Sequence, residues 1–357
     1  ALFYLFISLS KTSDEAKSPE TMRGSQSQKN LKDVPVISTY AADLEVPWAI
    51  GFLPDGAMLV TERPGAVRMI DTNGNASSLA QIPVRNIGEG GLLGIALDPD
   101  FATNNLVYLY YTFEQEGQNT LNRVVKYRFE NNKLVIDKII VDRIPGALFH
   151  NGGRIKFGPD GFLYITTGDA QEPSLAQDKK SLAGKILRVT RDGNPAPNNP
   201  FGTRIYSYGH RNPQGITWDN NGRLWSTEHG SSATDELNLI TPGKNYGWPE
   251  IRGEQTRTGM VSPVIQSGSQ TWAPAGIAYY NDSIFFAGLR GTALFEYRIN
   301  EQKLVEHFKN EHGRLRDVVL GPDNMLYVAT SNRDGRGNPD SGDDRILKIN
   351  PQKLSEL

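Results

Sequence analysis

The stretch Phe52-Leu-Pro-Asp-Gly-Ala-Met-Leu-Val-Thr61 decides the fold, because it recurs along the chain. Close copies are Phe157-Gly-Pro-Asp-Gly-Phe-Leu-Tyr-Ile-Thr166, Trp218-Asp-Asn-Asn-Gly-Arg-Leu-Trp-Ser-Thr227 and Leu320-Gly-Pro-Asp-Asn-Met-Leu-Tyr-Val-Ala329. Looser copies surround Asp100 and Asp282. Each copy joins a turn containing Asp or Asn, often with Gly, to a short strand of aliphatic and aromatic residues. This pattern is typical of a β-hairpin.

The spacing of the copies predicts the architecture. The turn residues Asp55, Asp100, Asp160, Asn220, Asp282 and Asp323 follow one another at intervals of 45, 60, 60, 62 and 41 residues. Such a period corresponds to one four-stranded propeller blade with loops of varying length. We therefore predict an all-β protein, a six-bladed β-propeller of four-stranded antiparallel blades. A strand over residues 36–40 is expected to complete the last blade beside residues 346–349, because ring closure protects strand edges.

Composition limits the classes of function. The 357 residues include 36 Gly and 21 Pro, which suits a turn-rich β protein. With 38 Lys and Arg against 40 Asp and Glu, the formal charge is −2, so the chain has no global basic field and no nucleic-acid partner is expected. The absence of Cys excludes disulfides, thiolate metal sites and a Cys nucleophile.

The first 35 residues differ in character from the rest. Residues 1–10, ALFYLFISLS, are mostly apolar, and the residues up to about 30 are rich in Ser, Lys, Glu and Gln. We interpret residues 1–35 as the remnant of an export signal or membrane anchor with a flexible tether, and residues 36–357 as the catalytic propeller. The protein is thus expected to be extracytoplasmic, whether periplasmic, cell-surface or secreted, and either tethered to a membrane or released by cleavage.

Residues able to do chemistry gather in the loops between the repeats. In His150-Asn-Gly-Gly-Arg154 an imidazole that can act as a base stands directly before a repeat strand, and the glycines allow a ligand close to the backbone. Propeller loops converge on one face, so four arginines in these loops would meet there and attract a polyanion. They are Arg211, Arg290, Arg314 and Arg316. The alternative for each arginine is neutralisation by a neighbouring carboxylate.

An ordered set of motifs indicates a family. It comprises Gly-Glu-x-Gly-Leu-Leu-Gly from Gly88, His-x-Gly-Gly-Arg from His150, Arg-Asn-x-Gln-Gly from Arg211, Asp-Glu-Leu-Asn with Asn-Tyr-Gly-Trp-Pro from Asp235, and Arg-x-Arg-Asp from Arg314. From about residue 44 to 350 the chain resembles the soluble quinoprotein glucose dehydrogenases and aldose sugar dehydrogenases. These are six-bladed propellers that use pyrroloquinoline quinone (PQQ) with calcium.

The resemblance implies a role for each matched residue. His150 matches the general base that takes the anomeric hydroxyl proton while hydride passes to PQQ, and Arg211 the residue that stabilises charge on the reduced quinone. The cofactor contacts implied are Glu89, Arg211, Asn212, Thr271, Trp272, Arg290, Arg314 and Arg316. The backbone carbonyls of Gly230 and Ser231 match ligands of the catalytic calcium. Glu236 and the carbonyl of Tyr246 match a structural calcium site, for which ordinary loop hydrogen bonding is the alternative.

Departures from the family pattern bear on the substrate. Glu89 stands where the glucose enzymes have Gln, Ser231 where they commonly have Pro, and Phe149 where they place a substrate-binding Asp. The loss of that Asp favours a broader aldose specificity. The expected partners are an aldose sugar and an external electron acceptor, a quinone, cytochrome or dye, and the protein is expected to be a monomer or homodimer. The remaining histidines, His210, His229, His307 and His312, are interpreted as structural.

Two other functions remain open at this level. One is a calcium-dependent lactonase of the six-bladed type, whose metal centre would need acidic and Asn side chains in the channel. The other is a propeller that serves as an extracellular binding module without catalysis. Uptake of PQQ in the presence of calcium distinguishes the dehydrogenase from both.

Overall fold

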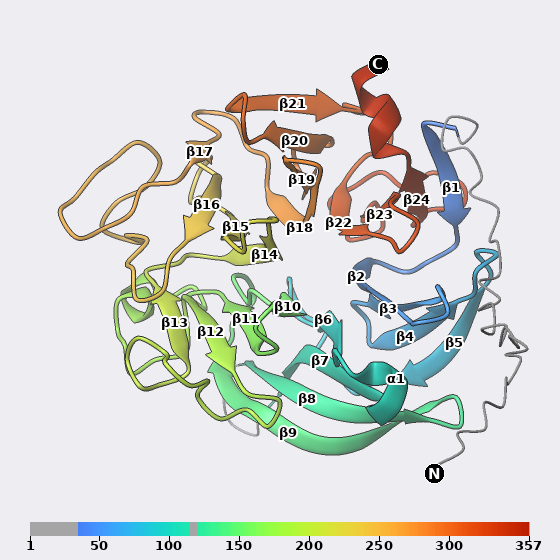
Figure 1. The fold of residues 1–357 in the computed structure, drawn as a ribbon, viewed down its shortest axis with the longest axis horizontal. Coiled ribbons are helices and arrows are strands. Elements are labelled where there is room, and N and C mark those ends of the chain that lie inside the picture. Colours follow the sequence, from blue (N-terminus) through green and yellow to red (C-terminus); the bar gives the residue numbers. More distant parts are fainter. Residues whose placement is uncertain (1–34, 115–119, 357) are drawn as a thin grey trace, which may run out of the picture. The chain divides into compact units, whose positions relative to one another are not determined.

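The predicted ring of six four-stranded antiparallel sheets is confirmed (Figure 1). The computed structural model describes residues 35–114 and 120–356. The innermost strands of the six blades are β2, β6, β10, β14, β18 and β22, and each contacts the innermost strands of the neighbouring blades around the ring. The predicted remnant of a signal or anchor over residues 1–35 lies, up to residue 34, outside the described residues.

The first three blades lie in sequence order, from the innermost strand outward. Blade 1 contains β2 (Pro47–Phe52), β3 (Met58–Glu62), β4 (Ala66–Ile70) and β5 (Ala76–Gln81). Blade 2 contains β6 (Leu92–Leu97), β7 (Leu106–Phe113), β8 (Leu121–Glu130) and β9 (Lys133–Pro145). Blade 3 contains β10 (Ile155–Phe157), β11 (Leu163–Thr167), β12 (Lys185–Val189) and β13 (Ile205–Tyr208).

Two further blades repeat this order, and the sixth departs from it. Blade 4 contains β14 (Pro213–Trp218), β15 (Leu224–Glu228), β16 (Glu236–Ile240) and β17 (Ile265–Gln266). Blade 5 contains β18 (Pro274–Tyr280), β19 (Ser283–Gly288), β20 (Leu294–Arg298) and β21 (Lys303–His307). Blade 6 takes β22 (Leu315–Leu320), β23 (Leu326–Thr330) and β24 (Ile346–Ile349) from the end of the chain and β1 (Ile37–Ala41) from its beginning.

The strand pairing that closes the ring matches the prediction. In β1 and β24, Ile37 pairs with Ile349 and Thr39 with Leu347, antiparallel. Pairing with β24 supplies the sixth blade with its fourth strand, so the ring is closed by hydrogen bonds between strands from opposite ends of the described chain.

The recurring Asp residues explain why the repeat folds as it does. In the turn between the first two strands of a blade, the carboxylate of Asp55 accepts a hydrogen bond from the backbone N–H of Ala57, at 3.0 Å. Asp160 and Asp323 accept equivalent bonds from the residues two positions later. An Asp side chain that bonds its own backbone in this way fixes a tight turn. These residues therefore specify the hairpins.

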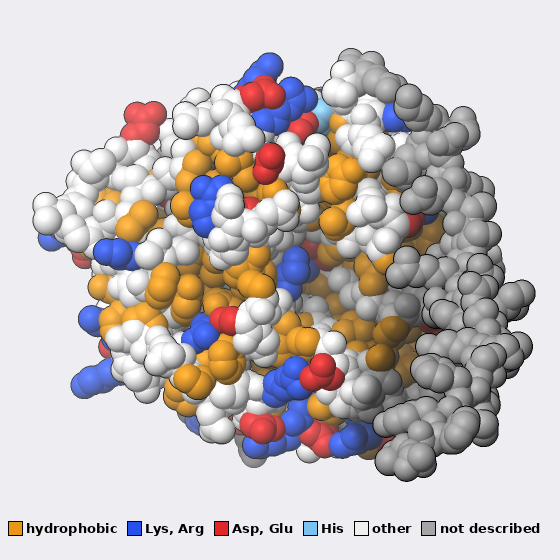
Figure 2. Space-filling model, in the orientation of Figure 1, with side chains coloured by type: hydrophobic (Ala, Val, Ile, Leu, Met, Phe, Trp, Pro, Cys, Tyr) orange, Lys and Arg blue, Asp and Glu red, His pale blue; other side chains and the backbone are white. Residues whose placement is uncertain are grey.

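Helices are short in the described residues. They are α1 (Phe101–Asn104), which follows the turn of Asp100, and the 3-10 helices η2 (Pro173–Ala176) and η3 (Pro351–Glu356). None of the described helices is long and apolar enough to cross a membrane. On the face shown in Figure 2, basic and acidic side chains are interspersed around the rim, in keeping with a formal charge near zero.

A buried lysine holds the loop that contains η2. Lys185, on β12, is fully buried, and its Nζ donates to the carbonyl oxygens of Leu175, Ala176 and Ala183 at distances of 2.5 to 3.1 Å. Lys185→Met would leave these carbonyls without their donor, so we expect the free energy of unfolding to fall by about 3 kcal/mol or more. Urea denaturation beside the exposed variant Lys133→Met measures this loss; equal midpoints would contradict it.

Candidate active site

A cavity of about 560 Å³ lies where the loops between strands converge. Most of the predicted site residues line it, and they come from loops of all six blades. They are Glu89, His150, Arg211, Gly230, Ser231, Thr271, Arg290 and Arg314. The cavity wall also includes Phe149, His229 and Arg336. The structure therefore confirms that these loops converge on one face.

His150 is paired with a buried carboxylate. Its Nδ1 lies 2.7 Å from Oδ1 of Asp169, which is fully buried and lies two residues beyond the end of β11. The backbone of His150 has φ +62°, and Gly152 and Gly153 also have positive φ, which brings the loop against β11. A Cβ on Gly152 would lie 2.6 Å from the carbonyl oxygen of Thr166, so the close approach needs glycine.

The Asp169 pairing has a chemical consequence. A carboxylate acceptor at Nδ1 keeps the proton of the neutral imidazole on that nitrogen, which leaves Nε2 free to accept a proton. Sequence reasoning missed Asp169. The signal that could have found it is Thr167-Gly168-Asp169, an acidic residue two positions after a repeat strand, at the face where the loops converge.

Glu89 joins two loops at the mouth of the cavity. Its Oε2 accepts the backbone N–H of His150 at 3.3 Å, and its Oε1 lies 2.9 Å from Nη1 of Arg336. Burial alone would raise the pKa of Glu89, but His229 and Arg336 outweigh it and hold the pKa below its ordinary value. The guanidinium of Arg336 also lies 5.4 Å from the ring centre of Phe149. Arg336, which sequence reasoning left out, thus forms part of the rim.

The arginines of the cavity differ in how far they are neutralised. Arg314 is paired with Asp334 through Nε and Nη2, at 3.0 and 2.8 Å. Arg290 is exposed, and its side chain has no ionic or hydrogen-bonding partner among the described residues. Burial lowers the pKa of Arg211, and its Nε has no partner in the described part of the chain. The cavity therefore keeps positive charge that its own carboxylates do not balance.

Arg316 lies deeper, outside the residues that line the cavity. It is 4% exposed, its Nη1 donates to Oε1 of Gln214 at 2.7 Å, and its guanidinium lies 5.7 Å from a ring centre of Trp48. Burial lowers its pKa to about 9, and Arg314 and Arg63 act in the same direction. Its buried Nε has no partner among the described residues.

Asn212 and Trp272 do not line the cavity either. Asn212 is fully buried and its Oδ1 accepts the backbone N–H of Gly152 at 3.0 Å, so its side chain supports the His150 loop. The ring of Trp272 packs in the core of blade 5, with ring centres 5.7 Å from Phe286 and 5.6 Å from Phe295. Trp272 therefore packs in the core, whereas its neighbour Thr271 lines the wall of the cavity.

The segment predicted to bind the catalytic calcium is held by one carboxylate. Asp235 accepts the backbone N–H of Gly230 through Oδ1 at 2.8 Å and that of Trp272 through Oδ2 at 2.7 Å. Burial lowers the pKa of His229 to about 4, so its ring is neutral at pH 7. His229, interpreted from the sequence as structural, is thus an uncharged part of the cavity wall.

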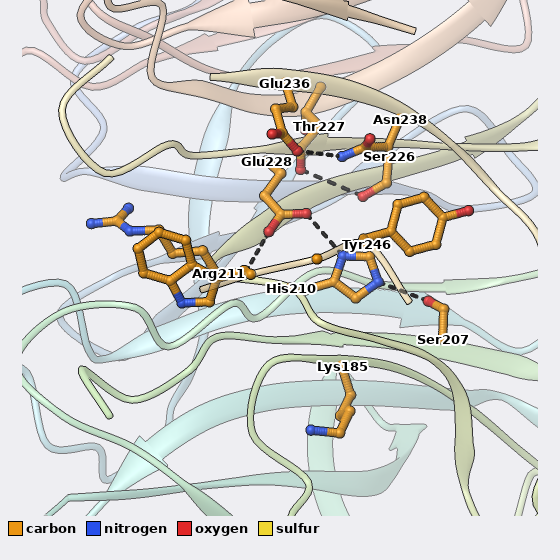
Figure 3. A network of polar contacts seen from close by, with 12 residues as sticks. Lys185, Ser207, His210, Arg211, Ser226, Thr227, Glu228, Glu236, Asn238 and Tyr246 are labelled. Carbon is orange, nitrogen blue, oxygen red and sulfur yellow. Dashed lines mark hydrogen bonds and ion pairs between the residues drawn. The ribbon is translucent and has the colours of Figure 1, made fainter. Parts of the chain in front are cut away.

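A second polar cluster lies behind this segment, between β15 and β16 (Figure 3). Glu228 and Glu236 are cross-strand partners, and Glu228 also lies 2.8 Å from Nδ1 of His210. Burial, followed by the charge of Glu228, raises the pKa of Glu236 to about 8. Oδ1 of Asn238 is buried without a partner in the described residues. Tyr246 stacks on His210 with ring centres 4.8 Å apart.

This cluster has the character of a cation site without being a complete one. No group of three or more His, Cys, Asp or Glu side chains in the described residues could by itself hold a metal ion. The carboxylate of Glu236 accepts from Nδ2 of Asn238 at 3.0 Å and from the backbone N–H of Gly253 at 3.4 Å. Its oxygens and the unpartnered Oδ1 of Asn238 are the hard donors that calcium takes, and backbone carbonyls would have to complete the set.

The chain also matches a family of known proteins. The sequence pattern of the family described as Glucose / Sorbosone dehydrogenase covers residues 44–342. The chain belongs to this family. Among its relatives, aldose sugar dehydrogenase YliI of Escherichia coli K12 is 33% identical over 350 residues, which are 87% of this chain and 91% of that protein. Quinoprotein glucose dehydrogenase B of Acinetobacter calcoaceticus is 30% identical over 71% of this chain and 59% of that protein.

A solved structure of the family matches the fold closely. The PQQ-bound form of aldose sugar dehydrogenase from Streptomyces coelicolor has a TM-score of 0.83 and 43% identity, covering 88% of this chain and 96% of that one. The resemblance to quinoprotein glucose and aldose sugar dehydrogenases inferred from the motifs is thereby confirmed.

Proposed function

We propose that the protein is a PQQ- and calcium-dependent dehydrogenase that oxidises the anomeric carbon of aldose sugars to the lactone. The observation that carries the proposal is the single cavity that joins the His150–Asp169 pair to the side chains of Arg211, Arg290 and Arg314. Membership of a dehydrogenase family whose Streptomyces coelicolor member binds PQQ supports it.

The residues present fit an anionic quinone cofactor. PQQ carries three carboxylates, and arginine pairs with carboxylate through two parallel hydrogen bonds. Arg290, free of partners in the described residues, the unpartnered Nε of Arg211 and the Arg314 guanidinium would hold such a group, with Arg316 below them. When bound, PQQ would supply the acceptor for the hydride of the sugar. The cavity of about 560 Å³ leaves a place for the substrate beside His150.

The chain's own groups supply the proton chemistry. Nε2 of His150 takes the proton of the anomeric hydroxyl, and Asp169 holds the imidazole in the tautomer that makes this possible. Arg211 presents positive charge where negative charge develops during hydride transfer. The carbonyl oxygens of Gly230 and Ser231 would hold the catalytic calcium, a hard cation suited to oxygen ligands.

The rim of the cavity points to aldoses as a class. Phe149 offers no acceptor for a specific sugar hydroxyl, and Glu89 is already engaged by Arg336 and the His150 backbone. We therefore expect a broad aldose range with an external electron acceptor. The proposal includes an extracytoplasmic location, which the apolar residues 1–10 suggest.

Reduction of a redox dye by purified apo-protein, with an aldose panel and with or without PQQ and calcium, tests the function. Sugar-dependent reduction that requires both additions supports the proposal. Failure to bind PQQ at all would contradict it and favour the lactonase or the binding module.

Calcium is expected to stabilise the cofactor-free protein through Glu236. Without a cation this half-buried carboxylate lies opposite Glu228 on the neighbouring strand, and a bound cation would relieve the repulsion. We expect calcium to raise Tm at pH 8 relative to protein in chelator, and Glu236→Gln to lose most of that increase. The exposed Glu254→Gln is the control. An equal increase in both variants would place the calcium elsewhere.

A further inference from the structure

Trp248 contacts two of the three side chains that the proposed chemistry uses, Asp169 and Arg211. Its indole Nε1 donates to Oδ2 of Asp169 at 2.8 Å, and the guanidinium carbon of Arg211 lies 5.3 Å from the indole ring centre. One side chain thus joins the carboxylate of Asp169 to the guanidinium of Arg211. Trp248 lies in the long connection between β16 and β17, and it is not one of the residues that line the cavity.

The hydrogen bonds of Asp169 show what the indole does. Because Asp169 is fully buried, its oxygens depend on donors from the protein. Oδ1 accepts the backbone N–H of Gln171 at 2.9 Å and faces Nδ1 of His150, whereas Oδ2 has the indole N–H as its only donor among the described residues. The indole therefore fixes the rotation of the carboxylate, and with it the direction of the bond to His150.

The backbone of Trp248 is itself held on both sides. Its N–H donates to the carbonyl oxygen of Gly209 at 2.9 Å, and its carbonyl accepts Nε2 of Gln177 at 2.6 Å. Gly209 lies two residues before Arg211, so the same connection is tied to the loop that carries the arginine. Such support on both sides gives the indole a defined position relative to both groups.

We propose that Trp248 is a positioning residue for the reaction. Its N–H orients Asp169 so that His150 keeps its proton on Nδ1 and its lone pair on Nε2, and its ring face supports the guanidinium of Arg211. The inference rests on the proposed function, in which His150 is the base. The Asn-Tyr-Gly-Trp-Pro motif would thus serve to position the catalytic groups.

Trp248→Phe separates the two contacts, since phenylalanine keeps a ring beside Arg211 and loses the N–H donor. We expect kcat to fall about 10- to 100-fold, the effect of a small misplacement of a catalytic group, with KM for the sugar and the affinity for PQQ changed by less than about 3-fold. The larger change, Trp248→Leu, also removes the ring and is expected to lower kcat further.

The chain offers a matched control in Trp225. Its Nε1 donates to Oδ2 of the buried Asp219 at 2.9 Å, and neither residue lines the cavity. Trp225→Phe makes the same deletion of an indole donor from a buried carboxylate. We expect a similar fall in Tm and an unchanged kcat. Equal kcat values for the two variants would overturn the proposal.

A second readout does not depend on the loaded enzyme. The chain has five histidines, so ¹⁵N labelling of histidine in the apo-protein gives five imidazoles, and the spectrum of His150→Gln identifies the signal of His150. We expect the Nδ1–H tautomer in the wild type and a loss of its dominance in Trp248→Phe but not in Trp225→Phe. An unchanged tautomer would overturn the route through Asp169, even if kcat falls.

A double-mutant cycle tests the route directly. If Trp248 acts through Asp169, Trp248→Phe should have little further effect on kcat in an Asp169→Asn background, and full additivity would contradict this. Should Trp248→Phe not fold, the wild-type indole N–H signal of Trp248 is expected to move on Asp169→Asn while that of Trp225 stays. No movement would overturn the contact. Absence of sugar oxidation by the wild type would instead refute the proposed function, and the tautomer measurement would still decide the inference.

Discussion

His150→Ala is expected to lower kcat for aldose oxidation by about two to four orders of magnitude, the usual range for removal of a general base. The reason is that Nε2 of His150 is the nitrogen left free by the Asp169 contact at Nδ1, and it belongs to the wall of the cavity. PQQ binding is expected to persist, because the arginines remain. Steady-state dye reduction with saturating PQQ and calcium measures the loss.

The control for this prediction is another histidine paired with a carboxylate. Nε2 of His307 lies 2.8 Å from Oε2 of Glu296, outside the cavity. His307→Ala should reduce stability and leave kcat near that of the wild type. Near-normal turnover in His150→Ala would show that another group takes the proton.

Arg314→Ala combined with Arg316→Ala is expected to weaken the affinity for PQQ by about 100-fold or more, and to slow the saturated enzyme much less. Arg314, half-buried, lines the cavity just before β22, and Arg316, on β22, is buried below it. Removal of charged partners of a carboxylate costs several kcal/mol of binding. Titration of apo-protein with PQQ, followed by absorbance or by recovered activity, gives the affinity.

Two comparisons make this result interpretable. Arg290→Ala removes an exposed guanidinium that has no partner in the described residues, so its effect on affinity comes without loss of an internal ion pair. Arg188→Ala breaks an ion pair with Asp160 on the outside of blade 3 and should leave the titration unchanged. A PQQ titration of the double variant that matches the wild type would place the anchors of the cofactor elsewhere.

The sequence was sufficient for the architecture because its repeat is a physical unit. The copies that contain Asp55, Asp160 and Asp323 became turns between the first and second strands of a blade, since the Asp carboxylate bonds the backbone two residues later. The closing strand was predictable because the last blade of a closed propeller is completed by a strand from the other end of the chain. The 13-residue length of β9 could not be predicted. The order of its charged and apolar residues does not indicate where its pairing with β8 ends.

The site was predicted in its loops and less well in its individual side chains. His150, Arg211, Arg290 and Arg314 reach the cavity as expected. Asp169 was missed because a single Asp after a strand resembles any loop residue until its partner is known. The order of residues does not reveal whether an aromatic ring faces the core or the cavity. Trp272 packs against Phe286, and its contact with the cofactor stays a prediction.

The pairing of β1 with β24 also constrains when the protein can fold. β1 is synthesised before the strands of the first five blades and β24 after them, so those five blades can form one by one on the ribosome while the sixth stays incomplete until β24 has emerged. A nascent or prematurely terminated chain presents an open strand edge, with exposed N–H and C=O groups able to pair with another chain. Closure of the ring therefore depends on β24, a strand that contributes no residue to the lining of the cavity.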